Sequence, residues 1–144
     1  MDRAALEQLV REVLLEKLGG QAVPAHGVRR VNVPQVRVSE ADRMDTGKAG
    51  DRVYTHDLFT LEESPRLGAG IMEMTDSTFH WTLNYDEMDY VVEGRLDVLV
   101  GGDKISAGPG EVIYIPKGSS IQFSVTGHAR FLYFVYPADW QNQK

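Results

Sequence analysis

The most constraining feature of the sequence is a series of short alternating segments, separated by turn residues, from residue 52 to residue 136. Apolar and polar residues alternate there with the period of two that is typical of strands rather than helices. Gly101-Gly102, between two such segments, predicts a two-residue hairpin because both glycines accept a positive φ. Many strands without intervening helices predict an all-β antiparallel sandwich or barrel. The expected strands are 52–60, 67–75, 79–82, 87–93, 95–100, 103–106, 111–115, 120–125 and 129–136.

The first 27 residues have a different pattern and form a separate region, ahead of a single β domain over residues 28–144. Apolar residues at helical spacing predict an amphipathic helix over residues 2–18, which Asp2 caps. Gly19 and Gly20 end this helix, and residues 19–27 read as a linker. An isolated helix of this length is only marginally stable in water, and its apolar stripe therefore needs a partner. That partner is the chain itself, a second copy or another protein. The stripe consists of Leu6, Leu9, Val10, Val13 and Leu14.

Between the linker and the strands, alternating valines over Val28–Val38 predict an extended segment that Pro34 confines to a sheet edge. A small barrel offers this segment no obvious partner within one chain. We therefore expect a homodimer in which the segment exchanges between protomers.

Composition excludes several classes of function. The chain has no cysteine, which rules out disulfides, iron–sulfur clusters and thiol nucleophiles. With 15 basic against 21 acidic residues the net charge is -6, and such a surface repels nucleic acid. No apolar stretch approaches the ~20 residues that cross a bilayer, so no membrane partner is expected.

Two segments, Phe79–Gly94 and Gly110–Gly118, together resemble the two motifs of the cupin superfamily, a jelly-roll β-barrel. The resemblance places Glu87 on the family's metal-binding glutamate and His80 on its first metal-binding histidine. Thr82 and Ile121 stand where the other two histidines belong. The usual cupin transition metal therefore lacks its nitrogen ligands and is not expected.

Two acidic residues share a face of the strand that begins at Glu87, because side chains alternate along it. If Glu87 points into the barrel, as the cupin resemblance implies, Asp89 points there too, with Cα atoms roughly 6.6 Å apart. Two carboxylates in such a cavity must take up a proton or a cation. Mg²⁺ is the natural cation, held by Glu87 and Asp89. In the alternative, Asp89 faces solvent and Glu87 is a vestige of a lost metal site.

A longer string, Trp81-Thr-Leu-Asn-Tyr-Asp-Glu87, and the segments Ile115–Ile121 and Arg130–Gln141 resemble the ethanolamine-utilisation protein Q (EutQ) cupins. This resemblance implies a bacterial microcompartment pathway and an acetate kinase, with ATP as substrate and a divalent cation. Glu87, Asp89 and Tyr85 would then be the catalytic residues, with His80 shaping the acceptor site and Lys117 touching phosphate. The alternative is a non-catalytic assembly or scaffold factor with a vestigial site.

The same resemblance implies a place in the bacterial cytoplasm, on or inside a microcompartment. Short amphipathic N-terminal helices on linkers resemble the encapsulation peptides of microcompartment cargo. We therefore expect residues 2–18 to dock on shell or cargo proteins by burying their apolar stripe.

Overall fold

The computed structural model describes residues 2–17 and 25–144. The chain divides into two compact units, residues 1–33 and residues 34–144, and each is described by itself.

The first unit contains the helix α1, Arg3–Lys17, which confirms the expected helix. The Ala5 N–H donates to Asp2 Oδ1 over 2.7 Å, so Asp2 caps the helix as its sequence position predicts. Leu6, Leu9 and Val10 are about half exposed, and docking through this stripe stays a prediction. Residues 19–24 of the expected linker 19–27, and the expected last helix residue 18, lie outside the described residues. Among the described residues, no helix is long and apolar enough to cross a membrane.

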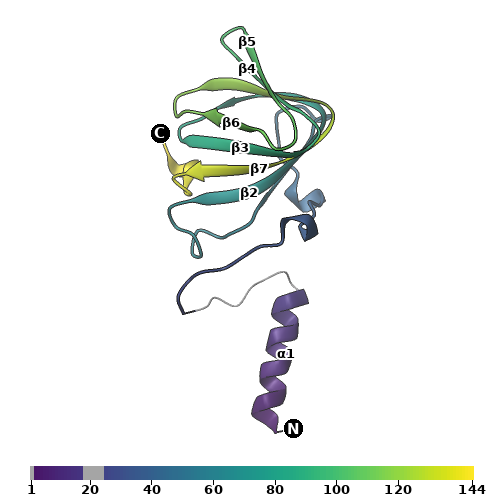
Figure 1. Ribbon diagram of the computed structural model, residues 1–144, viewed down its shortest axis with the longest axis vertical. Coiled ribbons are helices and arrows are strands. Elements are labelled where there is room, and N and C mark those ends of the chain that lie inside the picture. Colours follow the sequence, from purple (N-terminus) through teal and green to yellow (C-terminus); the bar gives the residue numbers. More distant parts are fainter. Residues whose placement is uncertain (1, 18–24) are drawn as a thin grey trace. The chain divides into compact units, whose positions relative to one another are not determined.

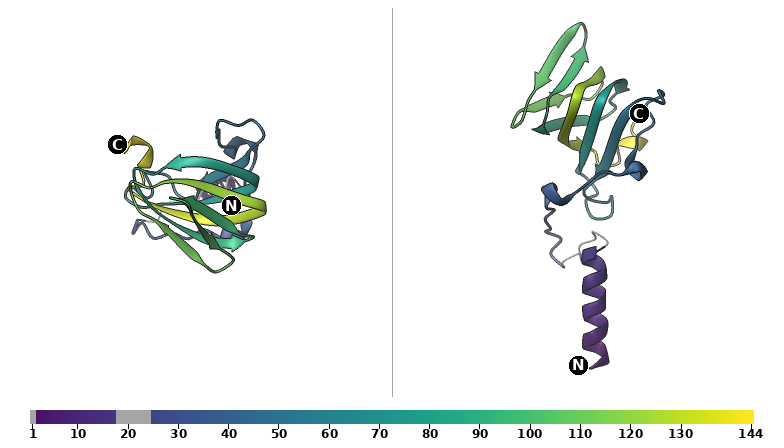
Figure 2. Two further views of the ribbon diagram at one scale, coloured as in Figure 1. Left: turned by 90° about the horizontal axis from the view of Figure 1, so that it is seen from above. Right: turned by 90° about the vertical axis from the view of Figure 1, so that its right-hand side faces the viewer.

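The second unit has the expected all-β fold, a sheet of seven antiparallel strands (Figures 1 and 2). Five strands follow the order β1-β2-β7-β3-β6, and β4 pairs with both β5 and β7. The β4–β5 hairpin turns at Gly101-Gly102, both with positive φ, as predicted. The strands are β1 (Arg52–Asp57), β2 (Gly68–Thr82), β3 (Asp86–Glu93), β4 (Leu96–Val100), β5 (Asp103–Ala107), β6 (Val112–Ile115) and β7 (Ser120–Tyr136).

Two of these strands are longer than the sequence predicts. Segments 67–75 and 79–82 join in β2, and 120–125 and 129–136 join in β7. Each strand carries an irregularity at the expected break, where Asp76 and Gly127 have positive φ. The two irregularities face each other, and the Gly127 N–H donates to Asp76 Oδ1 over 2.6 Å. The pairing of β2 with β7 shifts between Thr75 and Ser77, so a turn-like signal here marks a bulge rather than a chain reversal.

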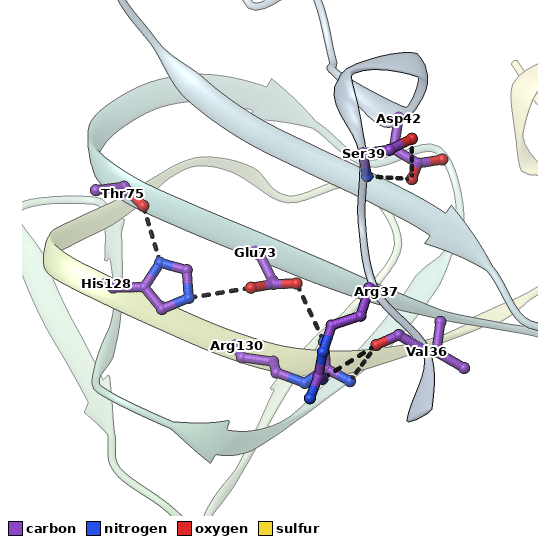
Figure 3. Close-up of polar contacts among 8 residues, drawn as sticks. All are labelled: Val36, Arg37, Ser39, Asp42, Glu73, Thr75, His128 and Arg130. Atoms are coloured by element: carbon purple, nitrogen blue, oxygen red, sulfur yellow. Dashed lines mark hydrogen bonds and ion pairs between the residues drawn. The ribbon is translucent and has the colours of Figure 1, made fainter. Parts of the chain in front are cut away.

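The expected extended strand over Val28–Val38 is wrong. The structure has no strand there and forms a 3₁₀ turn at Val33–Gln35 around Pro34. The Val36 carbonyl accepts a hydrogen bond from Arg130 Nη2 at 2.9 Å, so a side chain of β7 takes the place of a strand partner (Figure 3). The segment therefore has a partner within its own chain, and strand exchange loses its basis.

The inner face of the sheet carries the core. Every second side chain on β1, β2, β3, β6 and β7 points inward. The paired bulges at Asp76 and Gly127 keep apolar side chains on the inner face in both halves of β2 and β7. The largest fully buried apolar side chains of this core are Phe131, Met74, Leu83, Leu96, Val53 and Val91, and Ile71 is equally buried but does not belong to this cluster.

Candidate functional site

Glu87 and Asp89 both lie inside the barrel. They occupy alternate positions on β3, which runs between β6 and β7. Glu87 is 6% exposed and Asp89 is 0% exposed. The strand alternation therefore brings the two carboxyl groups to one inner face, and the alternative in which Asp89 faces solvent is wrong.

The Asp89 carboxyl group has no donor. Within the described part of the chain, neither of its oxygens accepts a hydrogen bond from a backbone or side-chain donor. Its polar neighbour is the Glu87 carboxyl, and two carboxyl groups bond to each other only when one carries a proton. Burial, and then the charge of Glu87, raise the pKa of Asp89 well above its usual range. Burial also raises the pKa of Glu87 to about 7, against hydrogen bonds from Asp89 and Tyr85 that lower it.

Beside this pair lies a cavity of about 340 Å³, and Glu87 forms part of its wall. Tyr85 precedes β3 and lines the same wall. Its hydroxyl accepts a hydrogen bond from Trp81 Nε1 at 2.8 Å, and burial and then the Glu87 charge raise its pKa. The cavity is lined by Met44, Asp45, Thr55, Asp57, Met72, Phe79, Trp81, Tyr85, Glu87, Phe123, Tyr133, Val135, Trp140 and Gln141.

The opposite wall depends on a glycine. Gly70 pairs with Asp57 of β1 on one side and with Tyr133 of β7 on the other. A Cβ at Gly70 would lie within about 2.0 Å of the Tyr133 hydroxyl, so only glycine lets this ring cross β2. The Tyr133 hydroxyl donates to Asp57 Oδ1 over 2.6 Å. The glycine thus allows a tyrosine and an aspartate two strands apart to meet at the cavity.

The remaining site residues expected from the sequence lie elsewhere. His80 is exposed on the outer face of β2, where its Nε2 contacts Ser120 Oγ at 2.8 Å. Lys117 is exposed in the turn after β6, and neither residue lines the cavity. The expectation that His80 and Lys117 work beside Glu87 is therefore not met. The structure brings together Glu87, Asp89 and Tyr85.

The residues present fit a hard cation better than a transition metal. No group of three His, Cys, Asp or Glu residues that could hold a metal ion of any kind occurs among the described residues, so a cation here would have only the Glu87 and Asp89 carboxyl groups as protein ligands. His80 and Thr82 are exposed, and Ile121 is buried and apolar. Two unpartnered Asp89 oxygens beside the Glu87 carboxyl suit Mg²⁺, which binds one or two carboxylates and completes its shell with water or phosphate oxygens.

Sequence reasoning missed several polar or aromatic residues of the cavity, among them Asp57, Tyr133 and Trp140. The alternation Val53-Tyr-Thr-His-Asp57 already places Asp57 on the same side of its strand as the buried Val53, although Asp57 itself is exposed at the end of the strand. No sequence signal shows that Tyr133 reaches Asp57, because that contact depends on the register of three strands.

Comparison with known proteins identifies relatives over the whole chain. The family model of the ethanolamine utilisation protein EutQ matches residues 1–142. A Clostridioides difficile protein named acetate kinase EutQ is 54% identical over 99% of this chain and 96% of its own length. The Escherichia coli protein of the same name is 35% identical over 98% of this chain, which spans 57% of that longer protein.

Solved structures agree with this result. The structure of the Clostridium difficile EutQ protein has 59% sequence identity and a TM-score of 0.82, covering 85% of this chain and 90% of that one. A cupin superfamily protein from Desulfitobacterium hafniense, at 16% identity and a TM-score of 0.53, shares the fold over 60% of this chain and 78% of its own. These similarities confirm the cupin-type fold and both resemblances found in the sequence.

Proposed function

Because the chain belongs to the EutQ family of ethanolamine utilisation proteins, we propose that it is an acetate kinase that depends on a divalent cation. One observation carries this proposal: a buried pair of carboxyl groups, with no counter-charge, beside a cavity of small-molecule size. The Clostridioides difficile relative that bears this name supports it.

The reaction suits a site without histidine. An acetate oxygen attacks the γ-phosphorus of ATP, the bond from that phosphorus to the β,γ-bridging oxygen breaks, and acetyl phosphate and ADP result. Acetate attacks as a carboxylate, so no general base is needed. Catalysis then consists of positioning and charge neutralisation. In this proposal Glu87 and Asp89 would hold Mg²⁺, which would supply neutralisation of phosphate charge, and Tyr85 positions the acceptor against the cavity wall.

The test measures ATP formation from acetyl phosphate, ADP and Mg²⁺ with the full chain. Glu87→Gln should lower the rate about 100-fold, because it removes one charge from the cation site. Glu93→Gln makes the same change at an exposed position on the same strand and should leave the rate unchanged.

Two outcomes would contradict the proposal. A Glu87→Gln protein with the parent's rate would remove Glu87 from the mechanism. A parent without activity would favour the alternative, a non-catalytic assembly or scaffold factor of a microcompartment. One observation already favours that alternative: the described cavity wall contains no Lys, Arg or His to meet a phosphate.

We further propose that the chain forms a homodimer through the outer face of β7, β3 and β6. Tyr114, Met88 and Phe134 form one row across these strands, and Tyr90 and Val112 form the next. These side chains and Tyr136 are about half exposed, which leaves an apolar area on the order of 600 Å². That area approaches the ~800 Å² that each partner contributes to a standard interface. A second copy of the same face is its natural cover, because apolar and uncharged side chains dominate both surfaces.

Sedimentation at micromolar concentration should therefore show a dimer of the 16.1 kDa chain. Phe134→Glu should shift the population to monomer, because it places a charge within the apolar face. Ile105→Glu, a matched change at another exposed apolar residue on β5, should leave the dimer intact. A monomeric parent, or a dimeric Phe134→Glu protein, would contradict this interface.

A further inference from the structure

The charge of the cavity wall disfavours binding of a free anion. Its wall carries three acidic side chains, Asp45, Asp57 and Glu87. No Lys, Arg or His lies among the described residues that line it. Glu87 is 6% exposed and has no cationic partner within the described chain. A buried carboxylate is costly unless a positive charge compensates it, so this wall favours a cation as occupant.

Aromatic rings complete the wall. Trp140, in the 3₁₀ turn Trp140–Asn142, packs against Trp81 at 5.8 Å and against Tyr85 at 5.3 Å between ring centroids. The Trp81–Tyr85 hydrogen bond fixes the other two rings relative to each other. Faces of tryptophan and tyrosine attract cations through their quadrupoles, most strongly where water is excluded. Rigid aromatic rings beside carboxylates are the arrangement that binds organic ammonium groups.

A metal ion alone does not account for these rings. Mg²⁺ prefers oxygen ligands and retains its water, and gains little from apolar surface. An ion with carbon atoms next to its positive charge uses both features of the wall, the carboxylates and the rings. The volume of about 340 Å³ lies near the lower end of the roughly 300–1,000 Å³ typical of ligand pockets, and so suits a small ion.

We propose that the cavity binds a small alkylammonium ion, with its positive charge between Glu87 and Asp57 and its carbon atoms against Trp81, Tyr85 and Trp140. This inference goes beyond the proposed function, since it needs neither nucleotide nor phosphoryl transfer. It gives the cavity a second class of ligand, which would exclude acetate when bound.

The chain provides its own probe. It contains two tryptophans, Trp81 and Trp140, and both line the cavity. Titration of the full chain with ethanolamine hydrochloride or tetramethylammonium chloride, at about pH 8 with EDTA, should change tryptophan fluorescence with saturation in the millimolar range. Sodium chloride at equal ionic strength controls for salt, and ethylene glycol is the neutral analogue of ethanolamine. Neither should give a saturable change.

Charge-removing variants test which carboxylates contact the ammonium group. Glu87→Gln and Asp57→Asn keep the shape of the wall and should each weaken ammonium binding about tenfold, equivalent to ~1.4 kcal/mol. Glu93→Gln should leave it unchanged. Equal binding of ethylene glycol, unaltered binding in both cavity variants, or no saturable signal from either ammonium ion would overturn the inference. Because no phosphate compound is present, an inactive kinase would leave this titration unaffected, so the two proposals fail separately.

Discussion

Replacing Arg130 with methionine is expected to destabilise the barrel by about 3–5 kcal/mol, the cost of removing one partner from a buried ion pair. The Arg130 side chain is 5% exposed, and its Nη1 lies 3.1 Å from Glu73 Oε2. Its Nη2 donates to the Val36 carbonyl, so it also holds segment 34–43 to the outer face of the sheet. His128 Nε2 contacts Glu73 Oε1 at 3.0 Å but is itself half exposed (Figure 3). Without Arg130 the Glu73 carboxylate, which is only 15% exposed, keeps this weaker partner.

Thermal and denaturant unfolding would measure the effect, a loss of roughly 10 °C for a chain of this size. Arg52→Met is the matched control. Arg52 pairs with Asp76 at 3.4 Å but is 51% exposed, so its loss should cost less than about 1 kcal/mol. Adding Glu73→Gln to Arg130→Met should recover part of the lost stability, because no buried charge remains unpaired. Equal effects of Arg130→Met and Arg52→Met would show that the buried pair is not what holds this face.

Replacing Asp89 with asparagine is expected to stabilise the protein increasingly as pH rises from about 4 to 8. Burial raises the pKa of both Asp89 and Glu87, so the folded pair retains protons that the unfolded chain releases. Stability from such groups is fully present below the unfolded pKa and is lost as pH rises through the folded pKa. Each retained proton costs about 1.4 kcal/mol per pH unit in that window. Asparagine keeps the shape, has no proton to lose and donates a hydrogen bond to Glu87.

At about pH 8 in EDTA we expect a gain on the order of 3 kcal/mol from Asp89→Asn, and at about pH 4 almost none. Melting temperatures across this range would measure it. Millimolar Mg²⁺ should raise the melting temperature of the parent at about pH 8 more than that of the variant, because a bound cation stabilises the fold by mass action. Parallel pH profiles of parent and variant would refute the buried pair as a titrating site. Equal responses to Mg²⁺ would refute it as a cation site.

The sequence predicted the site best where the direction of a side chain depends only on alternation along one strand. Glu87 and Asp89 share an inner face because they lie two residues apart on β3, and this follows from strand geometry alone. The same reasoning applied to Phe79 and Trp81 would have placed His80 on the outer face. The family resemblance instead assigned His80 to the metal site. Local alternation was the better guide at that position.

Contacts between distant strands could not be predicted in this way. Tyr133 reaches Asp57 only because β2 lies between their strands and has Gly70 at the crossing. The carbonyl of Val36 is bound by the Arg130 side chain rather than by a neighbouring strand. Both facts depend on register across the sheet, which short-range sequence patterns do not contain.

The central position of β7 has a consequence for how the protein forms during synthesis. Ser120–Tyr136 pairs with β2, β3 and β4, so three strands have an unsatisfied edge until these last residues have been made. The pairing joins residues as far apart in sequence as Gly68 and Val135, and such non-local contacts form slowly. A ribosome adding 5–20 residues per second therefore displays open strand edges for several seconds. The barrel closes only after translation has passed Tyr136. A chain released before Ser120 has all the strands that pair with β7 but lacks β7 itself. Its unpaired strand edges make it prone to aggregate.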